Sequence, residues 1–495
     1  MSSEKVQNVV VVGGGTAGWT AATSIARLVG ANLNVTLVES DAIGTVGVGE
    51  ATIPAFIALH RLLKIDEAEF LSKVQGTIKL GISFENWRDI GDEYIHAFGF
   101  TGEGCWAAGF QHFWLKAKQL GFADDYGRYS TELMAARANK FGLLKENGPS
   151  YAYHIDATRY AGYLRGIAEQ DGVTRIEGKI VDVNQAESGD IAAVVLESGK
   201  VVAGDLFIDC TGFVSLLMGK TLETEFEDWT HWLPCDRAIA VQTQAVSEPI
   251  PYTRSIAHEC GWQWRIPLQT RVGNGLVYCS EFMSDDEARE TLLGNVEGDV
   301  LTEPRVLRFR TGQRKQHWNK NCIALGLASG FLEPLESTSI HLIQRGVIRL
   351  LQMFPYNGIV AADQVEFNRQ MDTEFRFIRD FIIMHYHVNE RTDSAFWRRC
   401  RQMDIPESLQ HRLDLFRDTG RVFQAEGDVF TENSWTQVML GQGIEPASYH
   451  PIVDMMPEQE LRRFMQVLSQ RVDHVLGQLP SHQQFIDHYC PSTIR

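Results

Sequence analysis

Hydrophobic residues near the start of the chain change from one periodicity to another over a short stretch. Residues 9–12 are four successive valines, which suit a buried strand, and residues 17–28 place apolar side chains at helical spacing. Three glycines separate these two segments, and residues 34–38 form a second run suited to a strand. This order predicts a βαβ unit, in which a helix joins two parallel strands.

The rest of the chain divides into stretches of helical and of alternating periodicity. Residues 79–115 are the exception, because they are irregular and rich in aromatic side chains. The predicted helices cover residues 55–75, 157–170, 338–353, 362–386 and 457–478. The predicted strands lie within residues 174–210, which we interpret as an antiparallel meander, and within 236–283, 305–311 and 322–326. Residues 360–495 are expected to be mostly helical.

Composition and charge narrow the function classes. Apolar residues make up 44% of the chain and charged residues 22%, as in ordinary globular proteins. The net charge of -17 disfavours binding to nucleic acid or to anionic membrane surfaces. The chain shows neither a secretory leader nor an apolar run long enough to span a bilayer, so we expect a cytoplasmic, bacterial protein. The eight cysteines include no CxxC pair, which favours reduced thiols and no metal site.

The glycines after the first strand match a dinucleotide-binding fingerprint. In the pattern Gly13-x-Gly15-x-x-Gly18, the first glycine permits a tight turn, the second lets the backbone approach a pyrophosphate, and the third lets helix and strand pack closely. The helix N-terminus, with Thr16 and Ala17, would face the phosphates. Glu39 ends the second strand, where it can accept hydrogen bonds from ribose hydroxyls. A turn without a ligand could show the same glycines, but the strand–turn–helix context favours a cofactor.

Two later segments favour FAD over NAD as that cofactor. Residues 205–213 (DLFIDCTGF) are a hydrophobic strand ending in Asp-Cys-Thr-Gly, which resembles the late cofactor segment of flavoprotein monooxygenases. A second strand end with glycines covers residues 324–334, where a flavoprotein approaches the ribityl chain and ring. The candidate FAD-binding residues in these segments are Asp209, Gly212, Gly326, Gly330, Phe331 and Pro334. No second GxGxxG serves a nicotinamide, so reduced FAD is expected from a separate flavin reductase.

The predicted fold class is α/β, with a Rossmann-like FAD-binding lobe of the flavoprotein monooxygenase type, an inserted β-sheet lobe and a C-terminal helical lobe. We expect residues 1–350 to form the FAD-binding body and residues 351–495 to form a helical lobe on the substrate side. The cofactor segments of the body lie near 9–54, 174–215 and 305–350, and the inserted substrate and sheet segments lie near 79–170 and 216–304.

Four segments together carry a family resemblance. GGGTAGW at 13–19, GVGEATIP at 47–54, WQWRIP at 262–267 and PLEST at 334–338 resemble the flavin-dependent tryptophan halogenases, for which WxWxIP is the specific marker. The resemblance covers nearly the whole chain, including DFI at 380–382 and FWR at 396–398. It adds Gly49, Glu50 and Ala51 to the expected cofactor site.

The resemblance implies a reaction and its catalytic residues. Halogenases of this family use FADH2, O2 and chloride or bromide to form hypohalous acid, which crosses a tunnel to a separate aromatic substrate. The residues that match the family's catalytic pair are Lys79, which hydrogen-bonds the oxidant or becomes a haloamine, and Glu336, which positions the oxidant and takes the ring proton. Taken alone, Lys79 would read as a surface lysine and Glu336 as an acid favoured by a helix N-terminus.

Further sites follow from the same resemblance. The halide is expected at the backbone of Thr338 and Ser339, at a helix N-terminus. The family commonly has glycine where Ser339 stands, so a preference for bromide is a hypothesis. His96 and Phe98 match the H-x-F that lines the indole pocket, and Trp435 falls in the same region, although core packing would also suit these residues. The expected tunnel and wall residues are Trp262, Trp264, Ile266, Pro267 and Ser337.

One segment departs from the family pattern. Enzymes that halogenate free tryptophan carry an insertion with a tyrosine pair and a glutamate that hold the amino and carboxyl groups. Residues 421–446 are shorter here and contain no Tyr-Tyr. A site without these polar groups should not favour free tryptophan. The expected substrate is therefore indole, a substituted indole, or an indole within a larger molecule.

Two other functions remain open from the sequence. An FAD-dependent aromatic hydroxylase would share the Rossmann opening and the DCTGF segment, but it would not require Lys79 together with WxWxIP. A flavin-binding protein without catalysis is the second alternative, and the presence of Lys79 and Glu336 argues against it. The sequence fixes neither the ring position that reacts nor the oligomeric state, for which a homodimer is left open.

Overall fold

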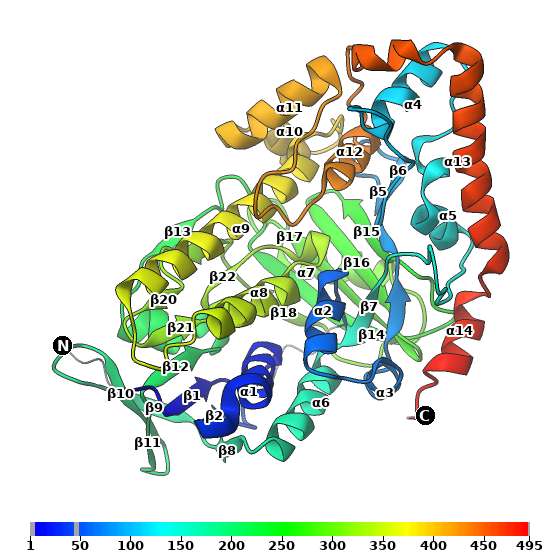
Figure 1. Ribbon diagram of the computed structural model, residues 1–495. Coiled ribbons are helices and arrows are strands. Elements are labelled where there is room, and N and C mark those ends of the chain that lie inside the picture. The colour runs from blue at the N-terminus through cyan, green and yellow to red at the C-terminus, as the bar shows by residue number, and fades with distance from the viewer. Residues whose placement is uncertain (1–4, 44–48, 494–495) are drawn as a thin grey trace.

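The computed structural model describes residues 5–43 and 49–493 (Figure 1). Gly47 and Val48, which belong to the predicted 47–54 segment, lie outside the described residues, as do residues 1–4. All eight cysteines are within the described part and are free thiols. None of the helices in residues 5–43 and 49–493 combines the length and the apolar character needed to cross a bilayer.

A six-stranded sheet confirms the predicted βαβ opening. In spatial order its strands are β20 (Trp318–Asn319), β21 (Cys322–Ala324), β12 (Leu206–Asp209), β1 (Asn8–Val12), β2 (Asn34–Glu39) and β8 (Thr174–Glu177). All neighbours are parallel except β20 and β21. The valines of β1 are buried on both faces, as a central parallel strand requires. The carboxyl ends of β1, β2, β12 and β21 meet at one edge, where Gly13 donates its N–H to Val38 O at 2.8 Å.

Helices cover this sheet, and one predicted helix is in fact two. α1 (Thr16–Val29) packs against α6 (Ala157–Gln170) and α8 (Ser339–Gln352). The helix predicted over 55–75 is interrupted, giving α2 (Ala55–Leu62) and α3 (Glu67–Lys73). The interruption has a local cause: Lys64 has a φ of +53°, and the Asp66 side chain caps α3 by accepting from Glu69 N–H.

The predicted meander at 174–210 is only partly correct. β8 and β12 belong to the parallel sheet, and only the three strands between them form an antiparallel sheet, which projects from one end of the molecule in Figure 1. These strands are β9 (Ile180–Gln185), β10 (Ile191–Leu196) and β11 (Val201–Ala203). Alternation alone does not distinguish the two arrangements, because a half-buried strand reads the same in both.

A seven-stranded sheet forms the second layer. Its order is β18 (Arg305–Arg308), β14 (Arg237–Gln244), β17 (Arg271–Tyr278), β16 (Gly261–Pro267), β15 (Thr253–His258), β5 (Gly81–Glu85) and β6 (Glu93–Ala97). The antiparallel prediction for 236–283 is confirmed, although β15 also pairs with β5 in parallel. The segment 79–115, predicted to be irregular, contains β5, β6 and α4 (Phe110–Gln119), since its aromatic side chains mask the alternation.

The edge strand β6 is held by a helix from the C-terminal part. In α12 (Glu432–Gly441), the Gln437 amide accepts from Ala97 N–H at 3.0 Å and donates to Ala97 O at 3.1 Å. Asn433 does the same just beyond the strand, with Thr101 N–H and Gly99 O. These two side chains replace the hydrogen bonds of a neighbouring strand.

Two smaller sheets join the layers. One consists of β3 (Gly49–Ala51), β7 (Ala152–Asp156) and β4 (Thr77–Lys79), and the other of β13 (Phe226–Asp228), β19 (Gly312–Arg314) and β22 (Gly330–Phe331). The remaining helices are α5 (Thr131–Arg137), α7 (Asp285–Gly294), α9 (Ala361–His387), α10 (Ala395–Gln402), α11 (Glu407–Thr419), α13 (Glu458–Gln478) and α14 (His482–Tyr489). The mostly helical part predicted from residue 360 is therefore present, and the main hydrophobic core runs through it and through the body.

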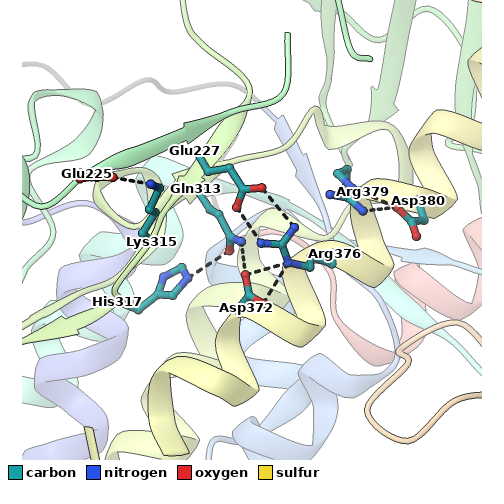
Figure 2. Close-up of polar contacts among 9 residues, drawn as sticks. All are labelled: Glu225, Glu227, Gln313, Lys315, His317, Asp372, Arg376, Arg379 and Asp380. Atoms are coloured by element: carbon teal, nitrogen blue, oxygen red, sulfur yellow. Dashed lines mark hydrogen bonds and ion pairs between the residues drawn. The ribbon is translucent and has the colours of Figure 1, made fainter. Parts of the chain in front are cut away.

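Polar contacts fix the long helix α9 against β13 and β19. Figure 2 shows Arg376 of α9 paired with Glu227 of β13 and with Asp372 one turn earlier. Asp372 also accepts from Gln313 of β19 at 2.6 Å. Since β19 pairs with β22, these contacts hold α9 in place relative to a predicted cofactor segment.

Candidate functional site

The glycine turn has the close contacts that its sequence predicts. Gly13 has a φ of +106°, and a Cβ there would lie 2.3 Å from Cys210 O. A Cβ on Gly18 would lie 1.8 Å from Gly13 O, so only glycine allows helix and turn to pack this closely. Gly15 caps α1, and a Cβ there would meet no atom of residues 5–43 and 49–493 within 4 Å. Open space at a helix N-terminus, beside Thr16 and Ala17, suits a pyrophosphate.

Glu39 and Asp209 end neighbouring strands but are engaged differently. The Glu39 carboxylate lies on the glycine turn, since a Cβ on Gly14 would be 1.4 Å from its Oε2, and Arg175 Nε donates to Oε1 at 2.5 Å. This position beside the turn fits the predicted contact with ribose. Asp209 is fully buried. Its carboxylate accepts hydrogen bonds from Thr211 and from the backbone N–H groups of Leu217 and Met218. Asp209 therefore shapes the loop that contains Gly212.

The other predicted cofactor residues lie on several elements. Gly326 packs against the first turn of α1, because a Cβ there would be 2.9 Å from Ala17 Cβ. Phe331 and Phe213 have ring centroids 5.3 Å apart and line a groove of about 270 Å³. Burial raises the pKa of Glu50, on β3, to about 7. The remaining members of the set are Gly49 and Ala51 of β3, Gly330 of β22, and Pro334, which begins the 3-10 helix Pro334–Glu336.

Lys79 is buried at the end of β4. Its Nζ donates to Ser337 Oγ at 2.7 Å and to Thr52 O at 3.1 Å, and it lies 5.3 Å from the ring centroid of Phe98. Burial lowers its pKa from 10.5 to about 7, and the negative charge of Glu336 opposes the shift. An amine in these surroundings is available both as a neutral nucleophile and as a cationic donor near neutral pH.

Glu336 is a buried carboxylate held between two imidazoles. His96 Nδ1 lies 2.9 Å from Oε2, and His385 Nε2 lies 2.8 Å from Oε1. The His385 contact has ion-pair distance without the alignment of a linear hydrogen bond. Burial raises the pKa of Glu336, but His96 and His385 more than offset this, and the pKa falls to about 2. The carboxylate is therefore ionised and able to accept a proton or face a cation.

Sequence reasoning did not identify His385 or Tyr94. The Tyr94 hydroxyl lies 2.9 Å from His385 Nδ1, and the His385 ring stacks on Phe84 with centroids 4.5 Å apart. Tyr94 shares a face of β6 with His96, so the alternation of that strand was an available signal. His385 gave none, because a histidine inside a long helix most often belongs to the core.

The predicted halide residues stand at the start of α8. Thr338 is fully buried and occupies the N-cap position, and Ser339 is the first helical residue. Within the described part of the chain, the Thr338 hydroxyl has no hydrogen-bond partner. Ser337, which accepts from Lys79, has a φ of +60° and turns the chain from Glu336 into this helix. A buried helix N-terminus with an unpaired hydroxyl is suited to an anion.

The two tryptophans of the WxWxIP segment lie side by side on β16. Their ring centroids are 6.1 Å apart, and Trp264 lies over Gly275, where a Cβ would be 2.0 Å from the ring. Trp262 Nε1 donates to Glu333 Oε2 at 2.9 Å, and the Tyr386 hydroxyl donates to the same oxygen at 2.5 Å. Burial raises the pKa of Glu333 to about 7. The tryptophans are thus fixed in the core by partners from two other segments.

The end of the same segment joins the Lys79 strand to the cofactor segments. A Cβ on Gly49 would be 3.3 Å from Ile266 Cγ2, so Ile266 packs against β3. Pro267 O accepts from Thr77 Oγ1 at 2.7 Å, at the start of β4. Ile266 and Pro267 therefore contact both β3 and the strand that carries Lys79.

Trp435 is the predicted pocket residue that the structure does not bring to Lys79 or Glu336. It is fully buried in α12, its indole N–H donates to Asp428 at 3.2 Å, and its ring packs on Phe381 at 4.7 Å between centroids. Phe381 in turn lies 5.6 Å from the His96 ring. Trp435 belongs to the packing layer behind His96, in a stretch of α12 whose residues 435–439 are all buried.

Known proteins resemble this chain over its full length. Residues 8–458 match the tryptophan halogenase family. A tryptophan 7-halogenase from Lentzea aerocolonigenes is 31% identical over 524 residues, which cover 98% of this chain and 99% of that protein. A tryptophan 6-halogenase from Streptomyces albogriseolus is also 31% identical, over 96% of this chain and 97% of its own.

Solved structures agree with the sequence comparison. A flavin-dependent halogenase from Xanthomonas campestris superposes with a TM-score of 0.98 at 55% identity, over 99% of this chain and 100% of that one. A second, from Brevundimonas sp. BAL3, gives a TM-score of 0.94 at 41% identity, over 98% of this chain and 100% of its own. The match of fold, of length and of the site segments leads to one conclusion: the chain belongs to the tryptophan halogenase family and is a flavin-dependent halogenase.

Proposed function

We propose that this enzyme transfers electrophilic chlorine or bromine through Lys79 to an indole-type aromatic substrate. One observation carries the proposal. A fully buried lysine, hydrogen-bonded to Ser337, lies next to the ionised Glu336 and before the buried start of α8. A buried lysine with a carboxylate neighbour would be unfavourable in a protein that used neither group.

The residues at the sheet edge fit FAD. Gly15 leaves open space at the helix N-terminus, and Glu39 lies against the turn where a ribose would bind. Flavin-dependent halogenases use FADH2, O2 and halide, and the bound flavin supplies hypohalous acid. The chain itself has no second glycine fingerprint for a nicotinamide cofactor, which supports supply of the reduced flavin by a separate reductase.

Thr338 and Ser339 are proposed to hold the halide. The first N–H groups of α8 lack intrahelical acceptors, as in every helix, and the Thr338 hydroxyl adds a buried donor. Together they offer several donors to one anion. Ser339 supplies a side chain where glycine is common in the family, and this larger group is the basis for the hypothesis of a bromide preference.

Lys79 is proposed to carry the halogen to the substrate ring. In its neutral form the amine can attack hypohalous acid, so that a nitrogen–halogen bond forms and the displaced hydroxide leaves as water with an amine proton. In its cationic form the ammonium can donate a hydrogen bond to the acid and polarise it. A pKa near 7 makes both forms available at neutral pH.

Glu336 is proposed to assist the final steps. The halogenated ring carries a positive charge until its C–H bond breaks, and a nearby carboxylate stabilises that charge. The C–H electron pair then returns to the ring, and the proton passes to the carboxylate. On the haloamine route the nitrogen–halogen bond breaks with its electron pair left on the Lys79 nitrogen, and this proton passes on to that nitrogen and restores the amine. Phe98, which lies under Lys79 Nζ, is half-buried and offers a face on which an aromatic ring can stack.

The C-terminal segment supports an indole in preference to free tryptophan. Residues 421–446 hold no tyrosine pair, and Asp428, an acid of this segment, is committed to Arg412 at 2.9 Å and to Trp435. A charged amino acid would find no ready partner in these groups. The relatives from Lentzea aerocolonigenes and Streptomyces albogriseolus are halogenases of tryptophan, and this chain is expected to differ from them in its substrate.

A product assay tests the proposal. The enzyme is supplied with FAD, a flavin reductase, NADH and O2, and is offered indole or tryptophan with bromide or chloride. Mass spectrometry of the wild type, of Lys79→Ala and of the exposed control Lys200→Ala should show halogenated indole, lost only with Lys79→Ala. A poor yield from tryptophan is expected. Hydroxylated product, or halogenated product from Lys79→Ala, would contradict the proposal.

A further inference from the structure

A chain of four buried polar groups extends from the site into the core. Glu336 contacts His96 through both carboxylate oxygens and His385 through Oε1, and His385 contacts Tyr94. The groups come from three elements: β6 contributes Tyr94 and His96, the 3-10 helix contributes Glu336, and α9 contributes His385. All four are buried, and His385 has no exposed surface.

The chemistry of these groups determines where the hydrogens lie. Glu336 is ionised, so its oxygens only accept. Burial lowers the pKa of His385, which leaves a neutral ring with a single N–H. We assign that hydrogen to Nε2, because Nε2 lies 2.8 Å from a carboxylate oxygen, which can only accept. Nδ1 is then an acceptor for the Tyr94 hydroxyl, whose pKa burial and Glu336 raise well above its usual range.

The His385 ring has little freedom to turn. It stacks on Phe84 at 4.5 Å, meets Phe381 edge-on at 5.4 Å and Trp87 at 5.9 Å. Its own carbonyl accepts from Gln442 Nε2 at 2.8 Å. A tautomer fixed by Tyr94 on a ring fixed by packing presents one N–H to one side of Glu336.

We propose that His385 is a positioning residue for halogen transfer: held by Tyr94, it aims the ionised Glu336 at the substrate. The proposal rests on the proposed function of Glu336. Catalytic contacts are often poorly aligned without substrate, and the His385 contact is of that kind. His96 Nδ1 lies within 3.1 Å of both carboxylate oxygens, whereas His385 Nε2 contacts Oε1 alone, so loss of His385 lets the carboxylate turn about its contact with His96.

Three variants distinguish the orienting effect of the His385 N–H on Glu336 from the packing of the His385 ring. His385→Phe keeps a ring against Phe84 but removes the N–H, whereas His385→Gln keeps a donor at the reach of Nε2. Tyr94→Phe removes only the hydroxyl that fixes the tautomer. The matched control is His60→Phe, because His60 forms a buried pair with Tyr160 at 2.9 Å outside the site. Flavin binding and unfolding midpoints of each variant report whether the protein is intact.

The readouts are hypohalous acid formation without substrate, kcat for halogenated indole, and the rate ratio between ring-protonated and ring-deuterated indole. His385→Phe should lower kcat about ten- to a hundredfold, the loss of one hydrogen bond to a charged group. His385→Gln should recover most of it, and Tyr94→Phe should lose a few-fold, roughly one neutral hydrogen bond. Hypohalous acid formation should not change. A misaligned base makes proton loss slow, so His385→Phe and Tyr94→Phe should gain an isotope effect that the wild type and His60→Phe lack.

Several results would overturn the proposal. Wild-type kcat in His385→Phe would do so, as would equal losses in the Phe and Gln variants with no isotope effect, since both indicate packing alone. If His385→Phe fails to bind flavin, wild-type behaviour of Tyr94→Phe is decisive against it. Failure of the proposed function looks different: the wild type itself would then form hypohalous acid but no Lys79-dependent halogenated product.

Discussion

Replacing Lys79 by methionine should remove a pH-dependent penalty from the unfolding free energy while it abolishes halogen transfer. Methionine matches the lysine stem in length and carries no charge into the buried site. The pKa of Lys79 falls from 10.5 in an exposed lysine to about 7 in the fold. The unfolded chain therefore binds more protons than the folded chain between these values, and the stability of the wild type rises with pH across that window.

The size of the effect follows from this shift. Each unit of pKa difference corresponds to about 1.4 kcal/mol. Burial of the ammonium therefore lowers the unfolding free energy of the wild type by about 5 kcal/mol well below pH 7. The penalty is about 4.5 kcal/mol near pH 6.5 and about 1.5 kcal/mol near pH 9.5. Loss of the donor to Ser337 and Thr52 costs about 1–3 kcal/mol per group, but this cost does not change with pH.

Denaturant unfolding of the wild type and Lys79→Met at several pH values measures the difference directly. The unfolding free energy of Lys79→Met minus that of the wild type should fall by about 3 kcal/mol between roughly pH 6.5 and 9.5. Lys200→Met, at an exposed lysine, should show no such trend. A difference between Lys79→Met and the wild type that stays constant with pH would refute the reasoning, because it would show that no buried ammonium is penalised.

Three further changes test other parts of the site. Gly18→Ala should lower the unfolding free energy by about 1–3 kcal/mol through overpacking, whereas Gly15→Ala should leave the unfolding midpoint intact and weaken FAD binding, measured by titration; equal effects of the two would contradict these roles. Glu336→Gln should lower the halogenation rate by about 10²–10⁴ with hypohalous acid formation intact, and a loss of both would place the carboxylate elsewhere in the reaction. Thr338→Val should raise the unfolding midpoint, since it removes an unpaired buried hydroxyl, and raise the halide KM; an unchanged KM would show that the hydroxyl does not bind halide.

The parts of the fold that the sequence predicts well depend on local chemistry. The close contacts of Gly13 and Gly18 involve the adjoining turn and strand, so the spacing of the glycines specifies them. The break at Lys64 was missed although it also has a local signal: Asp66 precedes Glu69 by three residues, which is a helix-start pattern. The division of residues 174–210 between two sheets has no such signal, because neighbouring strands in space decide it.

The site divides in the same way. Lys79 and Glu336 were identified through family motifs, and their burial and pairing agree with those assignments. His385 contacts Tyr94 across 291 positions of sequence, and no periodicity in α9 distinguishes it from a core residue. Trp435 was predicted to line the pocket from its place in the sequence; in the structure it lies beside Phe381, in a stretch of α12 whose residues 435–439 are all buried.

The strand that carries Tyr94 and His96 is the outermost strand of the seven-stranded sheet, and such strands are the usual starting points for aggregation. Here the exposed backbone next to the site is occupied by Gln437 and Asn433 of α12. Two amide side chains thus protect the open edge without adding a further strand. Substitutions at these two positions carry a risk of intermolecular sheet growth, and libraries that aim to change the substrate range should leave both amides in place.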